Sequence, residues 1–138
     1  MSRICKVLVI EDDDGVRSLL GDVFHDEGYE FTLVGSGTEM RDALDEDDYD
    51  VVIIDVSLRG SESGLVLADE ARERGCGVIV MTGDPRQMAQ VSASSWRSIV
   101  KPFHIEAMIA LVDLVLQETE AKCMRRTRRD GTAFPARL

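Results

Sequence analysis

The stretch Asp50-Val51-Val52-Ile53-Ile54-Asp55 is a short apolar run that ends in a carboxylate. An earlier run, Lys6–Ile10, ends in the acid cluster of residues 11–14, and two later runs end at Thr82 and just before Lys101. Continuous apolar runs of this length are typical of parallel strands that helices cover on both faces. Because the carboxyl ends of parallel strands share one edge of a sheet, the sequence predicts that these polar groups converge in one crevice.

Strands and helices are predicted to alternate five times along the chain. The predicted strands are Val7–Ile10, Glu30–Val34, Val51–Asp55, Val78–Met81 and Ser98–Val100. Apolar spacing and capping residues predict helices around Val16–Phe24, at Thr38–Asp45 and Gly64–Arg74, from Asp84 to about Ser94, and from about His104 to Glu120. The second strand has a mixed composition and is expected nearer an edge. A (βα)5 alternation with right-handed crossovers predicts an α/β three-layer sandwich around a parallel sheet.

The charge of the chain is divided unevenly between its body and its end. Residues 1–120 contain 10 Lys/Arg and 25 Asp/Glu, whereas residues 121–138 contain 6 and 1, which gives the net charge of −10. An acidic body argues against nucleic acid as its ligand. We therefore expect one domain over 1–120 and a basic, flexible tail over 121–138. No apolar run has the length of a membrane span and no signal peptide is apparent, so a cytoplasmic location is expected.

The three cysteines, Cys5, Cys76 and Cys123, are far apart and form no CxxC pair, so reduced structural thiols are expected. The tail carries five closely spaced cations: Lys122, Arg125, Arg126, Arg128 and Arg129. A frayed and solvated segment is the simplest interpretation of this composition. The alternatives are an intermolecular clasp on the acidic body, and a weak contact with an acidic partner or nucleic acid.

The acids at the predicted crevice suit a hard divalent cation. Mg²⁺ prefers oxygen ligands and keeps several waters, so one or two carboxylates and a phosphate suffice. Asp12 and Asp55 are the expected direct ligands, Glu11 would act through water, and the main-chain carbonyl of Ser57 could supply a further oxygen. Carboxylates clustered in this way repel one another, and a cation relieves that repulsion.

The same crevice predicts phosphoryl transfer. A carboxylate can serve as the nucleophile, while the protein positions groups and neutralises the oxygens of the transferred group. Asp55 is the expected nucleophile because it stands at the end of the middle strand, with Lys101 and Thr82 binding phosphoryl oxygens. Taken singly, each residue is ordinary: a helix cap, a solvated loop, a turn or a surface lysine. Their joint placement at strand ends favours the functional interpretation.

Residues 4–120 resemble the receiver domain of two-component response regulators, of the stand-alone, chemotaxis-regulator-like kind. The matching segments are Val7–Asp13, Asp50–Asp55, Gly64-Leu65, Val80–Gly83 and Val100–Phe103. The resemblance implies a flavodoxin-like sheet of order 2-1-3-4-5. It also implies that Asp55 accepts a phosphoryl group from a histidine kinase or phosphotransfer protein. Glu11 and Asp12 would bind Mg²⁺ (or Mn²⁺), Thr82 would be the switch hydroxyl and Lys101 the phosphate-binding ammonium.

The chain departs from the receiver pattern in three places. Arg59 stands where receivers usually have a proline, and the loop containing residues 60–63 is one residue longer than usual. Ser98 replaces the usual Tyr or Phe three residues before the lysine, which puts the aromatic switch of receivers in doubt. Trp96 is close enough in sequence to be considered for that role, although its position indicates the preceding loop.

The resemblance implies an output through the face made by the fourth helix, the fifth strand and the last helix. Leu111 and Leu114 fall off the core stripe of that helix, beside Ala107 and Ala110, and make a candidate patch for a protein partner or a homodimer. No DNA-binding or other output domain and no membrane segment are visible in the sequence, so a stand-alone receiver is expected.

Two rival functions stay open at this point. One is a receiver-like interaction module that works without phosphorylation, motivated by Arg59 and the missing aromatic residue. The other is a phosphohydrolase of the haloacid dehalogenase type, for which Asp12–Val16 superficially fits the D-x-D-x-V start. There Asp12 would be the nucleophile, and Asp55 would be left without a role. As a receiver, the chain would catalyse only its own phosphorylation and dephosphorylation, so no further enzyme activity is expected.

Overall fold

The computed structural model of the chain describes residues 3–59, 63–84, 86, 96–127 and 131. Its central sheet consists of β2 (Lys6–Ile10), β3 (Glu30–Val34), β4 (Val51–Asp55), β5 (Gly77–Thr82) and β6 (Arg97–Val100). All neighbouring pairs are parallel, and the strand order is β3-β2-β4-β5-β6. Counted along the chain from β2, this is the predicted order 2-1-3-4-5, and the mixed strand β3 lies at an edge as expected.

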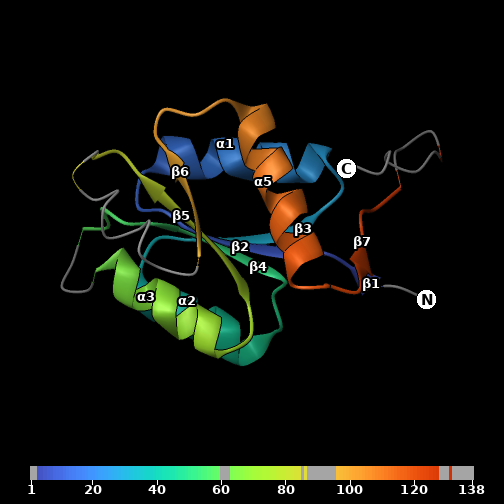
Figure 1. The fold of residues 1–138 in the computed structure, drawn as a ribbon, viewed down its shortest axis with the longest axis horizontal. Coiled ribbons are helices and arrows are strands. Elements are labelled where there is room, and N and C mark those ends of the chain that lie inside the picture. The colour runs from blue at the N-terminus through green and yellow to red at the C-terminus, as the bar shows by residue number, and fades with distance from the viewer. Residues whose placement is uncertain (1–2, 60–62, 85, 87–95, 128–130, 132–138) are drawn as a thin grey trace.

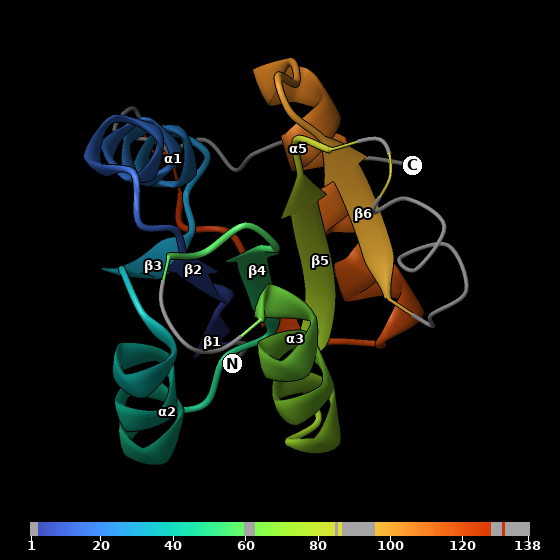
Figure 2. The same cartoon turned by 90° about the vertical axis from the view of Figure 1, so that its left-hand side faces the viewer.

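The described helices are α1 (Asp14–Asp26), α2 (Gly37–Glu46), α3 (Gly64–Glu73) and α5 (Ile105–Glu118). Helices α1 and α5 lie on one face of the sheet, and α2 and α3 lie on the other (Figures 1 and 2). Polar side chains begin several of these helices: Asp13 accepts a hydrogen bond from the Val16 N–H, and Ser63 accepts one from the Leu65 N–H. The helix predicted from Asp84 to about Ser94 falls mainly on residues outside the described ranges.

The core has two halves, one on each side of the sheet. Along β2, Leu8 and Ile10 face α2 and α3, whereas Val7 and Val9 face α1 and α5. This alternation follows from the two-residue period of a strand, and burial on both faces explains why the strand is apolar throughout. The central strands are thereby fixed in register, and the residues that follow their ends are held in place.

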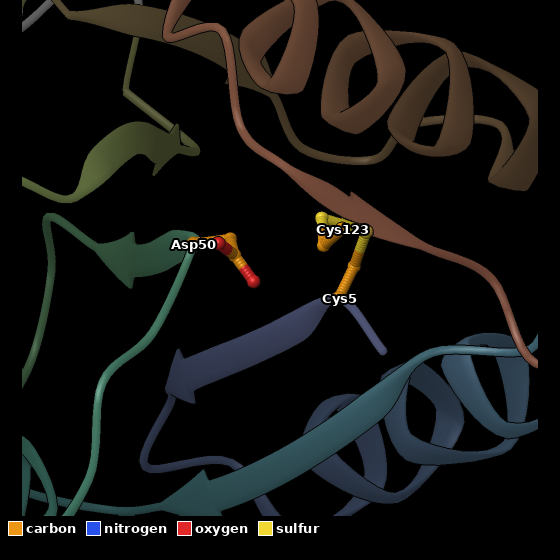
Figure 3. A group of neighbouring side chains, drawn as sticks. All are labelled: Cys5, Asp50 and Cys123. Atoms are coloured by element: carbon orange, nitrogen blue, oxygen red, sulfur yellow. A yellow bond between two sulfur atoms is a disulfide. The ribbon is translucent and has the colours of Figure 1, made fainter. Parts of the chain in front are cut away.

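A second, two-stranded sheet joins the ends of the described chain. Strand β1 (Arg3–Ile4) pairs in parallel with β7 (Cys123–Met124), and a disulfide connects Cys5 to Cys123 (Figure 3). The expectation of reduced thiols is therefore wrong for these two cysteines, whereas Cys76 is free and buried. The sequence could not indicate the pair, because its members are 118 residues apart and meet only where the chain returns after α5.

Helix α5 buries most of its predicted core stripe, including Met108, Ile109, Val112 and Val115. Leu114 is exposed, as the patch interpretation requires, but Leu111 is half-buried and packs against the core. The predicted two-leucine patch is thus reduced to Leu114 and its small neighbours. No helix in the described part of the chain combines the length and apolar character needed to cross a membrane.

Candidate functional site

The polar groups predicted to converge do converge at the carboxyl ends of the strands. Strand register places Ile10 beside Ile54, Asp55 beside Met81 and Thr82 beside Val100. Four adjacent strands therefore end at one level, and Glu11, Asp55, Thr82 and Lys101 each stand at or just after such an end. In doubly wound folds, ligands bind at this edge of the sheet, where the strand order reverses direction.

Three carboxylates gather at this edge. One carboxylate oxygen from each of Glu11, Asp12 and Asp55 lies within 4.8 Å of the others. Glu11 is 1% and Asp55 4% exposed, whereas Asp12 is partly open to solvent. Such a set of oxygen donors fits a hard divalent cation, which requires several oxygens and tolerates water in the remaining positions.

Lys101 joins two of these acids. Its Nζ donates to Glu11 Oε2 at 2.8 Å and to Asp55 Oδ2 at 3.0 Å. Burial raises the pKa of Glu11, and the neighbouring Asp55 raises it further, while the Lys101 ammonium acts in the opposite direction. Burial alone would lower the pKa of Lys101, but its hydrogen bonds to the two carboxylates reverse this, and the net shift is upward. The ammonium thus places a positive charge between two of the acids.

Backbone groups hold the acids in position. The Ser57 N–H donates to Asp55 Oδ1 at 2.9 Å, and the Asp13 N–H donates to Glu11 Oε1 at 3.2 Å. Behind Asp55, Gly64 approaches so closely that an added Cβ would lie 2.3 Å from the Asp55 carbonyl oxygen. Only glycine permits this contact between the start of α3 and the end of β4. The predicted role of the Ser57 carbonyl as a metal ligand stays a prediction.

Arg59 is the residue of the site that the sequence did not assign to it. Its N–H donates to Asp12 Oδ2 at 2.8 Å, and its Nε lies 3.2 Å from the same oxygen. The Arg59 side chain is 83% exposed, so this ion pair is weak and screened by salt. The only feature of the sequence that drew attention to Arg59 was that it stands where receivers usually have a proline. Arg59 thus places a positive charge beside one oxygen of Asp12.

Thr82 is fully buried at the end of β5. Its hydroxyl lies 3.3 Å from both the main-chain oxygen and nitrogen of Asp84, and its carbonyl accepts from the Lys101 N–H at 2.7 Å. The backbone thus links the threonine directly to the lysine. A bend follows at Lys101-Pro102, whose peptide bond is cis.

Ser98 and Trp96 are the two residues that the sequence brought into question for the aromatic switch of receivers. Ser98 pairs with Val80 in the middle of β6, whereas Trp96 precedes the strand at its opposite end. Trp96 packs against the core on the side of α2 and α3. It therefore does not take the place of the missing aromatic residue beside the threonine.

Comparison with known proteins agrees with this geometry. Residues 7–113 match the family model of the response regulator receiver domain. The chain belongs to this family. It is 33% identical over 104 residues to the aerobic respiration control protein ArcA of Escherichia coli, covering 71% of this chain and 42% of ArcA. This receiver thus spans less than half the length of that relative.

Solved structures show the same fold. The response regulator protein TrrA of Thermotoga maritima, in complex with Mg²⁺-BeF, has a TM-score of 0.74 and 28% identity, and the match covers 82% of this chain and all of TrrA. A CheY-like receiver domain protein of Methanospirillum hungatei has a TM-score of 0.76 at 20% identity, with 85% of this chain and 97% of that one covered. The second likeness supports the fold alone.

Proposed function

We propose that this receiver is a phosphoacceptor in which Asp55 takes a phosphoryl group from a histidine kinase or a histidine phosphotransfer protein. The observation that carries the proposal is the buried Asp55 carboxylate, 3.0 Å from the Lys101 ammonium and grouped with Glu11 and Asp12. A buried acid held between an ammonium and two further acids is expensive to maintain as structure alone, which supports a chemical role.

The donor set fits Mg²⁺, with Asp12 and Asp55 as direct ligands, Glu11 acting through water and the Ser57 carbonyl as a further candidate. The upward shift of the Glu11 pKa records the unfavourable burial and crowding of these acids. When bound, Mg²⁺ would neutralise them and balance the charge of an incoming phosphoryl group. Arg59 contacts only Oδ2 of Asp12, so Mg²⁺ would bind through the other oxygen or share Oδ2 with Arg59.

In the transfer step, the bond from phosphorus to the donor imidazole nitrogen breaks as a bond to an Asp55 carboxylate oxygen forms. The imidazole keeps the electron pair of the broken bond. Lys101, already 3.0 Å from Asp55 Oδ2, would follow the negative charge onto a phosphoryl oxygen. The Ser57 N–H keeps the other oxygen of Asp55 oriented during the attack.

The output is proposed to leave through Thr82 and the face of β6 and α5. The Thr82 hydroxyl would exchange its contacts with the Asp84 backbone for the phosphoryl group, and the linked Lys101 backbone would move with it. Val100, Ile105 and Leu114 are 43%, 39% and 38% exposed, which supports this face as the binding surface for a protein partner or a second copy. The cytoplasm, where histidine kinases present their phosphohistidine, is the proposed location.

The test is incubation of the protein with acetyl phosphate and Mg²⁺, followed by intact mass. The parent should gain one phosphoryl group, and Asp55→Asn should gain none. Asp22→Asn, an acid of α1 outside the site, is the matched control and should behave as the parent does. Thr82→Ala should still be phosphorylated but should lose the change in partner binding or self-association.

Other outcomes favour the rival functions. No adduct on the parent, with or without Mg²⁺, would support an interaction module that works without phosphorylation. Steady turnover of a phosphomonoester that Asp12→Asn abolishes and Asp55→Asn preserves would support a phosphohydrolase with Asp12 as nucleophile.

A further inference from the structure

The disulfide lies at the sheet edge opposite the site just described. It joins Cys5, between β1 and β2, to Cys123 in β7 (Figure 3). The two Cα atoms are 4.8 Å apart although 118 residues separate them in sequence. Backbone hydrogen bonds bring the two cysteines together, since β1 pairs with β7 and the Cys5 N–H donates to the Met124 carbonyl.

Contacts other than the disulfide also hold the basic segment 123–127. The Arg125 guanidinium lies 5.3 Å from the centre of the Tyr29 ring and forms an ion pair with Glu27. The Arg126 N–H donates to the Gly28 carbonyl at 2.6 Å. These contacts would keep the two thiols close together after reduction. Each thiol then has a high effective concentration at the other, which favours re-formation of the disulfide.

Access to the pair is unequal. Cys5 is 3% exposed, whereas Cys123 is half-buried, so an external thiol or disulfide reaches Cys123 more readily. Lys122 precedes Cys123 in sequence, whereas the Arg125 guanidinium is directed to Glu27 and the Tyr29 ring. In a reducing compartment, a disulfide of this kind is expected to be transient and to report redox state rather than to be permanent.

Asp50 is the remaining polar group at the pair. One of its oxygens lies within 4.8 Å of both sulfur positions, so the reduced cysteines and Asp50 could in principle bind a metal. Both Asp50 oxygens are already engaged, however, by the Arg3 guanidinium and, at 2.9 Å, by the Lys6 N–H. A metal would have to displace the bidentate ion pair between Arg3 and Asp50. Redox chemistry of the two cysteines is therefore favoured over metal binding at this place.

We propose that Cys5 and Cys123 form a redox modification site, whose reversible disulfide fastens residues 123–127 to β1 and to the turn between α1 and β3. In the closing direction the Cys123 thiolate attacks a low-molecular-weight disulfide and releases one small thiol. The Cys5 thiolate then attacks the Cys123 sulfur and releases the second. The cysteines lose two protons and two electrons, and the small disulfide gains both to become two thiols. This site is independent of the phosphoacceptor function.

The test equilibrates the full chain in buffers of varied reduced and oxidised glutathione, approached from both directions. After acid quench and denaturation, free thiols are alkylated and counted by intact mass. Cys76 supplies one label in every sample. The count should pass from one label to three as the buffer becomes reducing. Three labels at every ratio, or one label even in excess dithiothreitol under native conditions, would overturn the proposal.

Variants separate redox pairing from general structure. Cys76→Ser should keep the transition with one label fewer, and Cys123→Ser should lose it while remaining folded by circular dichroism. Arg125→Met should shift the midpoint toward more oxidising buffers by about threefold to tenfold, because the thiols meet less often. Arg41→Met, which removes the ion pair with Glu70 on the other side of the sheet, is the matched control and should not shift it.

Hydrogen exchange provides the second measurement. Amides of residues 123–127 should exchange at least about tenfold more slowly in the oxidised protein than in the reduced one, because the disulfide adds a covalent restraint to the weaker contacts that hold the segment. Equal exchange in both states would mean that the disulfide fastens nothing, and the proposal would be wrong.

Discussion

Replacement of Gly64 by alanine should destabilise the fold at the back of the phosphoacceptor. The added Cβ would lie 2.3 Å from the Asp55 carbonyl oxygen and 2.7 Å from the Val56 Cα. Both neighbours are backbone atoms of the segment that carries Asp55, so no side chain can rotate away. Ordinary contact begins at 3.4 Å, and the start of α3 must therefore move about 1 Å away from the end of β4.

The magnitude follows from two opposing effects. Overpacking of this kind costs about 1–3 kcal/mol, and more where backbone must shift. Alanine also favours a helix over glycine by about 1 kcal/mol, which offsets part of the loss because Gly64 begins α3. Because both clashing atoms belong to the backbone, the upper part of that range applies, about 2–3 kcal/mol, and the net expectation is a loss of about 1–2 kcal/mol in the free energy of unfolding.

Gly15→Ala is the matched control, since Gly15 is also near the start of a helix but its added Cβ meets only a side-chain oxygen of Asp13, at 3.3 Å. That variant should be as stable as the parent or more stable, by up to about 1 kcal/mol. Urea unfolding followed by far-ultraviolet circular dichroism measures both. If Gly64→Ala proves as stable as Gly15→Ala, the close approach of α3 to Asp55 is not real.

Three further predictions concern the charges and thiols. Lys101→Met leaves two buried acids without their ammonium, so it should lower the free energy of unfolding by about 1–3 kcal/mol. Mg²⁺ should then raise the melting temperature of this variant more than that of the parent, and an equal rise in both would contradict the prediction. Arg59→Ala removes the guanidinium from Asp12 and leaves the main-chain N–H contact in place, so it should tighten Mg²⁺ binding by up to about fivefold in a titration. Weaker binding would show that the Arg59 side chain assists the cation. Burial raises the pKa of Cys76 to about 11. Alkylation of this thiol at pH 8 should therefore be roughly a hundredfold slower in the native protein than in urea, and it should accelerate as the pH rises toward about 11. Equal alkylation rates in the native and unfolded protein would show that the thiol is not buried.

Much of the fold could be predicted because its signals are local. The apolar runs Lys6–Ile10 and Val51–Asp55 are strands buried on both faces, and their terminal acids meet because parallel strands end at one edge. The lysine that follows the last strand reaches Glu11 and Asp55 for the same reason. These features require only strand direction and order.

The features that sequence reasoning missed depend on contacts between distant residues. The pairing of Cys5 with Cys123 requires the chain to return along β1, which no spacing predicts. The contact of Arg59 with Asp12 depends on the path of a loop. The half-burial of Leu111 depends on how α5 is rotated against the sheet, and helical periodicity gives this only approximately.

The most direct test of the phosphoacceptor assignment identifies the carboxylate that carries the phosphoryl group. Protein treated with acetyl phosphate and Mg²⁺ is reduced with borohydride, which converts an aspartyl phosphate to homoserine, and is then digested with trypsin and sequenced by mass spectrometry. Cleavage after Lys6, Arg17, Arg41 and Arg59 places Asp12 in the peptide 7–17 and Asp55 in the peptide 42–59. The account predicts homoserine at position 55 and at no other position. Homoserine at position 12, or none in the peptide 42–59, would contradict it.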